Sequence, residues 1–138
     1  MTWVEKEVPS LELCRRLKEL GYPQGGGGWY WDETVDYSWK LYLYGNTPAH
    51  IKSQSVIKAP TCRELGEWLP VYVYKGKEYF LCCRPQSKKG RWALFYRHGI
   101  DEFLIIIEAD TEPNARAKLL IWLAENGYVK FGGGKSED

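Results

Sequence analysis

The sequence predicts an α+β fold: a mainly antiparallel sheet of about six or seven strands, with an N-terminal helix, a short middle helix and a C-terminal helix packed on it. Three stretches carry a helix cap followed by apolar residues at helical spacing. Between them lie short runs rich in β-branched and aromatic residues, separated by turn residues. Because short turns join neighbouring strands, most strand pairs are expected to be antiparallel.

The first helix is expected to begin after Ser10, whose hydroxyl can accept a hydrogen bond from a backbone N–H group of the first turn. Gly21 suits the left-handed conformation that ends a helix, and Pro23 follows two residues later. Apolar residues between these limits recur at the spacing of one buried stripe: Leu11, Cys14, Leu17 and Leu20.

Residues 29–31 and 37–44 predict two strands joined by an acidic turn. Side chains alternate between the two faces of a strand, so the second strand separates into a core-like face and a polar, aromatic face. The core-like face carries Tyr37, Trp39, Leu41 and Leu43, and the other face carries Ser38, Lys40, Tyr42 and Tyr44.

The middle of the chain predicts a strand over residues 51–59, followed by a short helix. Thr61 and Glu64 form the Thr-x-x-Glu pattern of a capping box, and Pro70 ends the helix. The last strand before the C-terminal helix, residues 103–107, is an uninterrupted apolar run, which predicts a central strand with both faces at least partly covered. Three further strands are expected between the short helix and this run, over residues 71–74, 78–84 and 92–97.

The C-terminal helix has signals at both ends. Thr111 offers an N-cap oxygen, Pro113 is tolerated in the first turn, and Gly127 suits the left-handed stop. This helix is expected to bury Trp122 against the sheet. A single domain is therefore expected over residues 1–131, followed by a disordered polar tail over residues 132–138.

Charge and cysteine content limit the classes of function. The formal net charge of the 138-residue chain is +1, which argues against a general binder of long nucleic acid or of a membrane surface. We recognise neither an apolar run near eighteen residues nor a signal peptide, which predicts a cytoplasmic protein. The cysteines contain no Cys-x-x-Cys pattern and suggest neither a disulfide framework nor a zinc site: Cys14, Cys62, Cys82 and Cys83.

No catalytic, cofactor or metal motif stands out. The four glycines of residues 25–28 could present backbone N–H groups to a phosphate, but neither a helix nor Lys-Ser/Thr follows them, so a flexible turn is the favoured interpretation. The spacing of His50 and His98 places neither beside a nucleophile or a set of metal ligands. We therefore expect a non-enzymatic protein without a cofactor or a bound metal.

Three segments, residues 17–24, 59–70 and 115–128, carry a resemblance. They read Leu-Lys-Glu-Leu-Gly-Tyr-Pro-Gln, then Ala-Pro-Thr-Cys-Arg-Glu-Leu-Gly-Glu-Trp-Leu-Pro, then Ala-Arg-Ala-Lys-Leu-Leu-Ile-Trp-Leu-Ala-Glu-Asn-Gly-Tyr. Their order and spacing resemble a family of small uncharacterised proteins encoded by bacteriophages and prophages, mainly of Gram-positive bacteria. The resemblance implies a fold, a phage origin and hence the host cytoplasm, but no chemistry.

The candidate binding residues are polar or aromatic side chains on predicted sheet faces. The chain has 7 Trp and 10 Tyr against 4 Phe, and such rings favour surfaces that contact both water and a partner. If the faces of separate strands coincide, they form a platform with rings for stacking and guanidinium groups for anions. The alternative is that these side chains merely decorate an exposed sheet face. The candidates are Lys40, Tyr42, Tyr44, Arg84, Arg91 and Arg97.

Two functions remain open. The first is a phage-type binding protein that interferes with host defence by sequestering a small, nucleotide-like anionic signal. The alternative is a protein–protein interaction module that docks on a host or phage protein and inhibits it. A homo-oligomer with its pocket at the subunit junction would favour the first, and a flat, exposed apolar patch on a monomer would favour the second.

Overall fold

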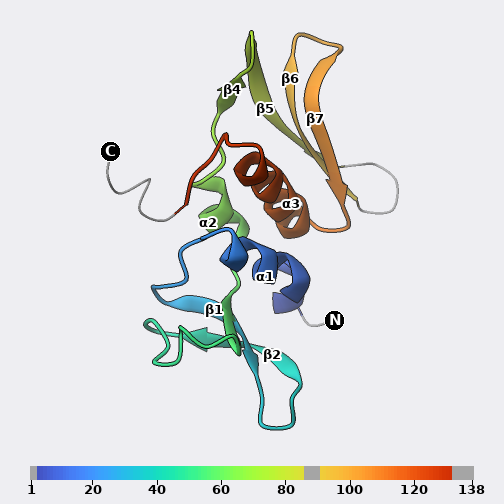
Figure 1. Cartoon of the computed structure of the whole chain (residues 1–138). Helices are drawn as coiled ribbons and strands as arrows, with labels where there is room; N and C mark the ends of the chain where they lie inside the picture. Colours follow the sequence, from blue (N-terminus) through green and yellow to red (C-terminus); the bar gives the residue numbers. More distant parts are fainter. Residues whose placement is uncertain (1–2, 86–90, 132–138) are drawn as a thin grey trace.

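The computed structural model describes residues 3–85 and 91–131, and within them it has three α-helices and seven β-strands (Figure 1). All strand pairs are antiparallel, which confirms the predicted α+β class. The strands are divided between two sheets, which lie at opposite ends of the molecule with the helices between them (Figure 1). The tail predicted to be disordered, residues 132–138, lies outside the described residues.

The first sheet has the strand order β2-β1-β3. Its strands are β1 (Gly28–Glu33), β2 (Trp39–Tyr44) and β3 (Val56–Lys58). Helix α1 (Leu11–Glu19) packs against this sheet, and a short 3-10 helix, η1 (Val4–Lys6), precedes it. A small core joins helix and sheet through Val8, Cys14, Trp31, Ile57 and Ala59.

The second sheet has the strand order β4-β5-β6-β7. Its strands are β4 (Tyr72–Tyr74), β5 (Glu78–Pro85), β6 (Trp92–His98) and β7 (Glu102–Ala109). Helix α3 (Glu112–Glu125) covers one face of the sheet, and α2 (Cys62–Gly66) packs beside α3. The larger core lies between α3 and the sheet, and its fully buried members include Leu94, Tyr96, Leu119, Leu120 and Leu123.

The prediction that residues 103–107 form a central strand is wrong, because they belong to β7, which lies at an edge of its sheet. The apolar side chains of β7 lie on both faces of the sheet. Ile105 and Ile107 pack towards α3, whereas Phe103 and Ile106 remain 42% and 49% exposed on the other face. Strands β5 and β6 take the two inner positions, and residues 93–96 of β6 are buried.

The predicted caps are confirmed at all three helices. Ser10 accepts a hydrogen bond from the N–H group of Leu13, and Thr111 accepts one from Asn114. Thr61 and Glu64 form the complete capping box at α2, with the Thr61 N–H group donating to the Glu64 carboxylate over 3.0 Å. Local side-chain chemistry therefore sets where each helix begins.

The placement of Trp122 differs from the prediction. Its indole is half-buried and stacks on the ring of Tyr128, with the ring centroids 5.6 Å apart, while the neighbouring Ile121 and Leu123 are buried. The chain turns back after Gly127, which has a φ of +82° as predicted for a helix stop, and so carries Tyr128 onto the indole.

Within residues 3–85 and 91–131, none of the helices combines the length and the apolar character that crossing a membrane requires.

Candidate functional site

The structure separates the predicted binding residues into two groups. Lys40, Tyr42 and Tyr44 lie on β2 in the three-stranded sheet. Arg84 and Arg97 lie on β5 and β6 of the four-stranded sheet, and Arg91 comes directly before β6. Because the two sheets lie at opposite ends of the molecule, the tyrosines and the arginines do not form one platform (Figure 1).

The tyrosine group is partly used in internal contacts. The Tyr44 hydroxyl donates to a carboxylate oxygen of Asp32, and His50 Nε2 lies 3.0 Å from the same oxygen. The hydrogen bond to Asp32 is the main cause that raises the pKa of Tyr44 to about 12, so this phenol stays protonated. Tyr42 and Lys40 are exposed beside it. This group therefore has one phenol engaged inside the protein and two side chains exposed beside it.

The arginine group lies on the face of the four-stranded sheet that α3 does not cover. We call this surface the outer face. In the strand register, Arg97 stands between Phe80 and Phe103, and Arg84 is next to Ala93. A hollow of about 420 Å³ runs over β5, β6 and β7 on this face, and the residues that line it include Arg84, Phe95, Arg97, Phe103, Ile106 and Glu108.

The two arginines of the hollow share one aromatic ring. The Cζ atoms of Arg84 and Arg97 lie 6.0 and 5.9 Å from the centroid of Phe95, which is within the range of cation–π attraction. In the part of the chain that the structure describes, neither guanidinium has a carboxylate within ion-pair distance. Arg91 differs, because its Nε lies 4.0 Å from Glu108. Two guanidinium groups thus lie beside one phenyl ring, without a carboxylate partner among the described residues, and can bind an anion.

Sequence reasoning identified the arginines of the hollow but missed its apolar lining. Phe103 and Ile106 belong to the run interpreted as a central strand, and Phe95 lies on the strand for which the prediction placed only Arg91 and Arg97 on one face. Alternation alone would have placed Phe95 and Arg97 on the same face of β6. That signal was available, whereas the edge position of β7 was not.

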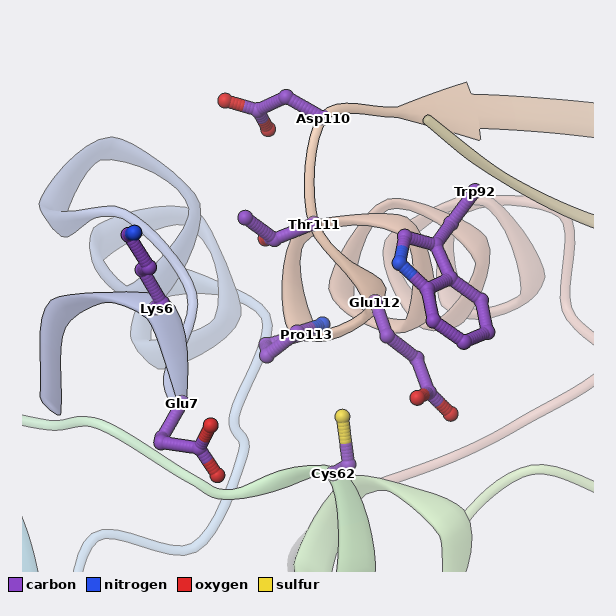
Figure 2. Close-up of a pocket in the computed structure, with 8 residues that line it drawn as sticks. All are labelled: Lys6, Glu7, Cys62, Trp92, Asp110, Thr111, Glu112 and Pro113. Carbon is purple, nitrogen blue, oxygen red and sulfur yellow. The ribbon is translucent and has the colours of Figure 1, made fainter. Parts of the chain in front are cut away.

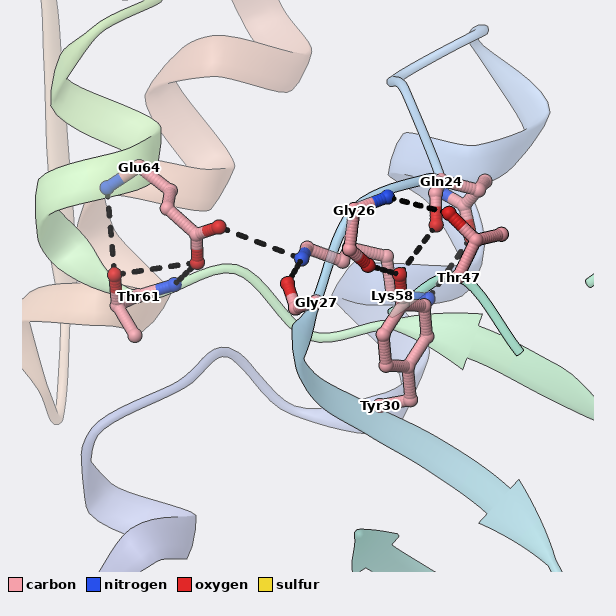
Figure 3. A network of polar contacts seen from close by, with 8 residues as sticks. All are labelled: Gln24, Gly26, Gly27, Tyr30, Thr47, Lys58, Thr61 and Glu64. Atoms are coloured by element: carbon pink, nitrogen blue, oxygen red, sulfur yellow. Dashed lines mark hydrogen bonds and ion pairs between the residues drawn. The ribbon is translucent and has the colours of Figure 1, made fainter. Parts of the chain in front are cut away.

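The glycine run, residues 25–28, lies beside the ammonium group of Lys58 (Figure 3). Lys58, which is buried, donates from Nζ to the carbonyl oxygen of Gly27 over 2.6 Å and lies 3.4 Å from Glu64 Oε2. Its ammonium also lies 4.9 Å from the centroid of the Tyr30 ring. A phosphate loop must present N–H groups to its ligand, but Gly27 turns a carbonyl oxygen to an ammonium. The run is therefore a turn fitted around Lys58.

A second cavity, of about 340 Å³, lies where η1, α2 and the start of α3 meet (Figure 2). Figure 2 shows the Cys62 thiol and the Glu112 carboxylate extending into it. Burial, together with the charge of Glu112, raises the pKa of Cys62 to about 12. A thiol that is protonated at neutral pH is a poor nucleophile, so this cavity gives no support to cysteine chemistry.

The histidines have other partners. His98 Nδ1 lies 2.8 Å from the carbonyl oxygen of Glu78, and His50 contacts Asp32 as described above. Among the described residues, no group of three or more histidine, cysteine or acidic side chains is placed to hold a metal ion.

Comparisons with models of protein families, with curated proteins and with solved structures find no match to this chain.

Proposed function

We propose that the hollow on the outer face binds a small, nucleotide-like anion. The observation that supports this proposal most directly is the position of Arg84 and Arg97: two guanidinium groups without a carboxylate partner in the described part of the chain lie over one phenyl ring in a hollow of about 420 Å³. Ligand sites for small molecules commonly have volumes of about 300–1,000 Å³ and combine an apolar lining with a few polar groups.

The charged and apolar residues that line the hollow have different chemical roles in this proposal. The guanidinium groups of Arg84 and Arg97 bind phosphate oxygens through charge-assisted hydrogen bonds. Phe95 is only 7% exposed and forms the floor beneath them, so the accessible apolar surface for a base comes from Ile100, Phe103 and Ile106. Glu108, at the end of the hollow, can accept hydrogen bonds from amino or hydroxyl groups of the ligand.

The biological setting of the proposal comes from the sequence resemblance. A phage-encoded protein that binds a nucleotide-like signal without changing it would lower the free concentration of that signal in the host cytoplasm. Such a protein needs binding groups but no catalytic base, and this requirement matches the chemistry of Arg84, Arg97 and their aromatic neighbours.

The test is calorimetric titration of the full chain with a panel of linear and cyclic nucleotides. Arg84→Ala and Arg97→Ala are each expected to weaken binding about tenfold or more, because a hydrogen bond to a charged group contributes roughly 1.5–3 kcal/mol. Tyr42→Ala is the matched control and should bind as the parent does, because Tyr42 lies on the other sheet.

Bound ligand should then be released by heat and analysed by chromatography. Recovery of unchanged nucleotide supports sequestration, and recovery of altered nucleotide would support an enzyme instead. If no nucleotide of the panel gives a heat of binding in the titration, the proposal is contradicted.

A second candidate is the protein-docking module, favoured by one specific observation. Tyr72 and Phe80 lie on the outer face beside the hollow and are 49% and 47% exposed, although neither lines the hollow. Exposed apolar patches of this kind mark interaction surfaces. This function would be supported if the chain bound no nucleotide and if Phe80→Asp abolished binding to a host protein captured by the parent chain.

A further inference from the structure

The hollow on the outer face has two chemically different sides. Its two guanidinium groups, those of Arg84 and Arg97, belong to β5 and β6. On β7 its exposed apolar side chains are Phe103 and Ile106. Glu108 follows Ile106 by two residues, so both side chains lie on the same face of β7. A base that rests on the apolar side of the hollow therefore has the guanidinium groups across the sheet and a carboxylate at one end.

A carboxylate is by itself an unfavourable component of an anion site. Glu108 lines the same hollow as Arg84 and Arg97, and its negative charge opposes the binding of a phosphate. A neutral residue at this position would give a stronger site for phosphate alone. The repulsion is compensated when the carboxylate meets N–H donors of a base, so only ligands with such donors gain from it. The position of Glu108 is thus suited to discriminate between nucleotides.

We infer that the carboxylate of Glu108 selects the base, and that the hollow binds a guanine nucleotide. A carboxylate accepts hydrogen bonds and cannot donate them. Among the common bases, only guanine has two neighbouring donors on one edge, the ring N1–H and the amino group on C2, and these match the two oxygens of a carboxylate. This inference rests on the proposed function, because it names the class of ligand for the same hollow.

The other bases present fewer donors to Glu108, or an acceptor that opposes it. Uracil and thymine have a single ring N–H between two carbonyl oxygens, and a carboxylate repels these oxygens. Adenine and cytosine each have one amino group beside an unprotonated ring nitrogen, so one carboxylate oxygen would face an acceptor. Hypoxanthine, the base of inosine, keeps the ring N–H of guanine but lacks its amino group. Inosine nucleotides therefore isolate the contribution of that one donor.

The contact between Glu108 and Arg91 leaves the carboxylate able to bind a base. Arg91 Nε lies 4.0 Å from Glu108 Oε1, which is longer than a hydrogen bond, and the two side chains are 44% and 52% exposed. The two oxygens of a carboxylate have about four lone-pair positions, so there is capacity for two further N–H donors. The charge of Arg91 also offsets part of the repulsion between Glu108 and the phosphate of the ligand.

The test is calorimetric titration of the full chain with the 5′-monophosphates and the 3′,5′-cyclic monophosphates of guanosine, inosine and uridine. The guanine nucleotide is expected to bind about tenfold more tightly than the hypoxanthine nucleotide of the same type, because the two differ by one amino group that donates to a charged acceptor. The uracil nucleotide is expected to bind no better than the hypoxanthine nucleotide, because its carbonyl oxygens face Glu108.

The variant Glu108→Ala separates recognition of the base from a general loss of binding. Guanine and hypoxanthine nucleotides should bind to it within about twofold of each other, because the acceptor that distinguishes them is gone. The uracil nucleotide should bind about twofold or more tightly than it binds to the parent, because a repulsive charge has been removed. A variant that had merely lost its fold would bind all three more weakly.

Glu78→Ala is the matched control. Glu78 is an exposed carboxylate on β5 of the same sheet but does not line the hollow. This variant loses the same charge as Glu108→Ala, so it corrects for the change in net charge. It should keep the parent's preference of about tenfold for the guanine nucleotide over the hypoxanthine nucleotide.

Equal binding of guanine and hypoxanthine nucleotides to the parent overturns this inference but leaves the proposed function standing, because nucleotides still bind. A guanine preference that persists in Glu108→Ala overturns it as well, since another group then recognises the base. If these nucleotides do not bind but others of the wider panel do, the inference is overturned and the proposed function stands. If no nucleotide binds at all, the proposed function is contradicted, and the inference with it.

Discussion

Replacing Lys58 with methionine is expected to destabilise the protein, because this buried ammonium holds the glycine turn against the start of α2. Methionine keeps most of the apolar length of the side chain but loses the hydrogen bond to the Gly27 carbonyl oxygen, the ion pair with Glu64 and the contact with the Tyr30 ring. These contacts connect β3, the turn before β1 and α2 (Figure 3).

The expected magnitude follows from what each lost contact contributes. The hydrogen bond from an ammonium to a carbonyl oxygen contributes roughly 1.5–3 kcal/mol. The ion pair adds less, because the Glu64 side chain is 37% exposed and stays anchored by the Thr61 N–H group. Removing the ammonium also removes its desolvation cost, which offsets part of the loss. We therefore expect a net destabilisation of about 2 kcal/mol.

Urea and thermal unfolding would measure this difference, which corresponds to a decrease in Tm of roughly 5–10 °C for a chain of this size. Lys40→Met is the matched control: Lys40 lies on β2 of the same sheet but is exposed, so the variant should melt close to the parent. A Lys58→Met protein as stable as Lys40→Met would refute the argument and show that the ammonium is not essential to the turn.

Two smaller predictions concern a helix cap and a titrating phenol. Thr61→Ala should cost about 1 kcal/mol in urea unfolding, whereas Thr61→Asp should be close to neutral because aspartate also caps; equal losses would contradict the cap. Because the hydrogen bond to Asp32 raises the pKa of Tyr44 from about 10 in the unfolded chain to about 12, its stabilisation is complete below pH ~10 and is lost as the pH rises through ~12. Between those pH values the melting temperature of Tyr44→Phe should therefore fall less than that of the parent. Equal decreases for the two proteins would contradict the stabilising role of the hydrogen bond from Tyr44 to Asp32.

The sequence by itself determined the helices and most of the strands, because the signals that place them are local. Ser10, Thr61 and Thr111 each cap the helix that was expected to follow, since a cap depends only on a side chain and the backbone three residues later. Strand alternation likewise needs only a period of two. The α+β class follows from these local signals and from the short turns between strands.

Only the tertiary structure decided how the strands are shared between two sheets and which of them lies at an edge. The apolar residues 103–107 predict a strand, but they do not show which elements lie beside it. Contacts between segments far apart in the sequence decide this: α3 packs on one face of β7, and Phe103 and Ile106 are exposed on the other. The same choice separated Tyr42 from Arg97 and brought Arg84 and Arg97 to one phenyl ring, Phe95. Local patterns predict a face for most side chains, whereas the long-range packing of whole elements decides which faces meet and which remain exposed.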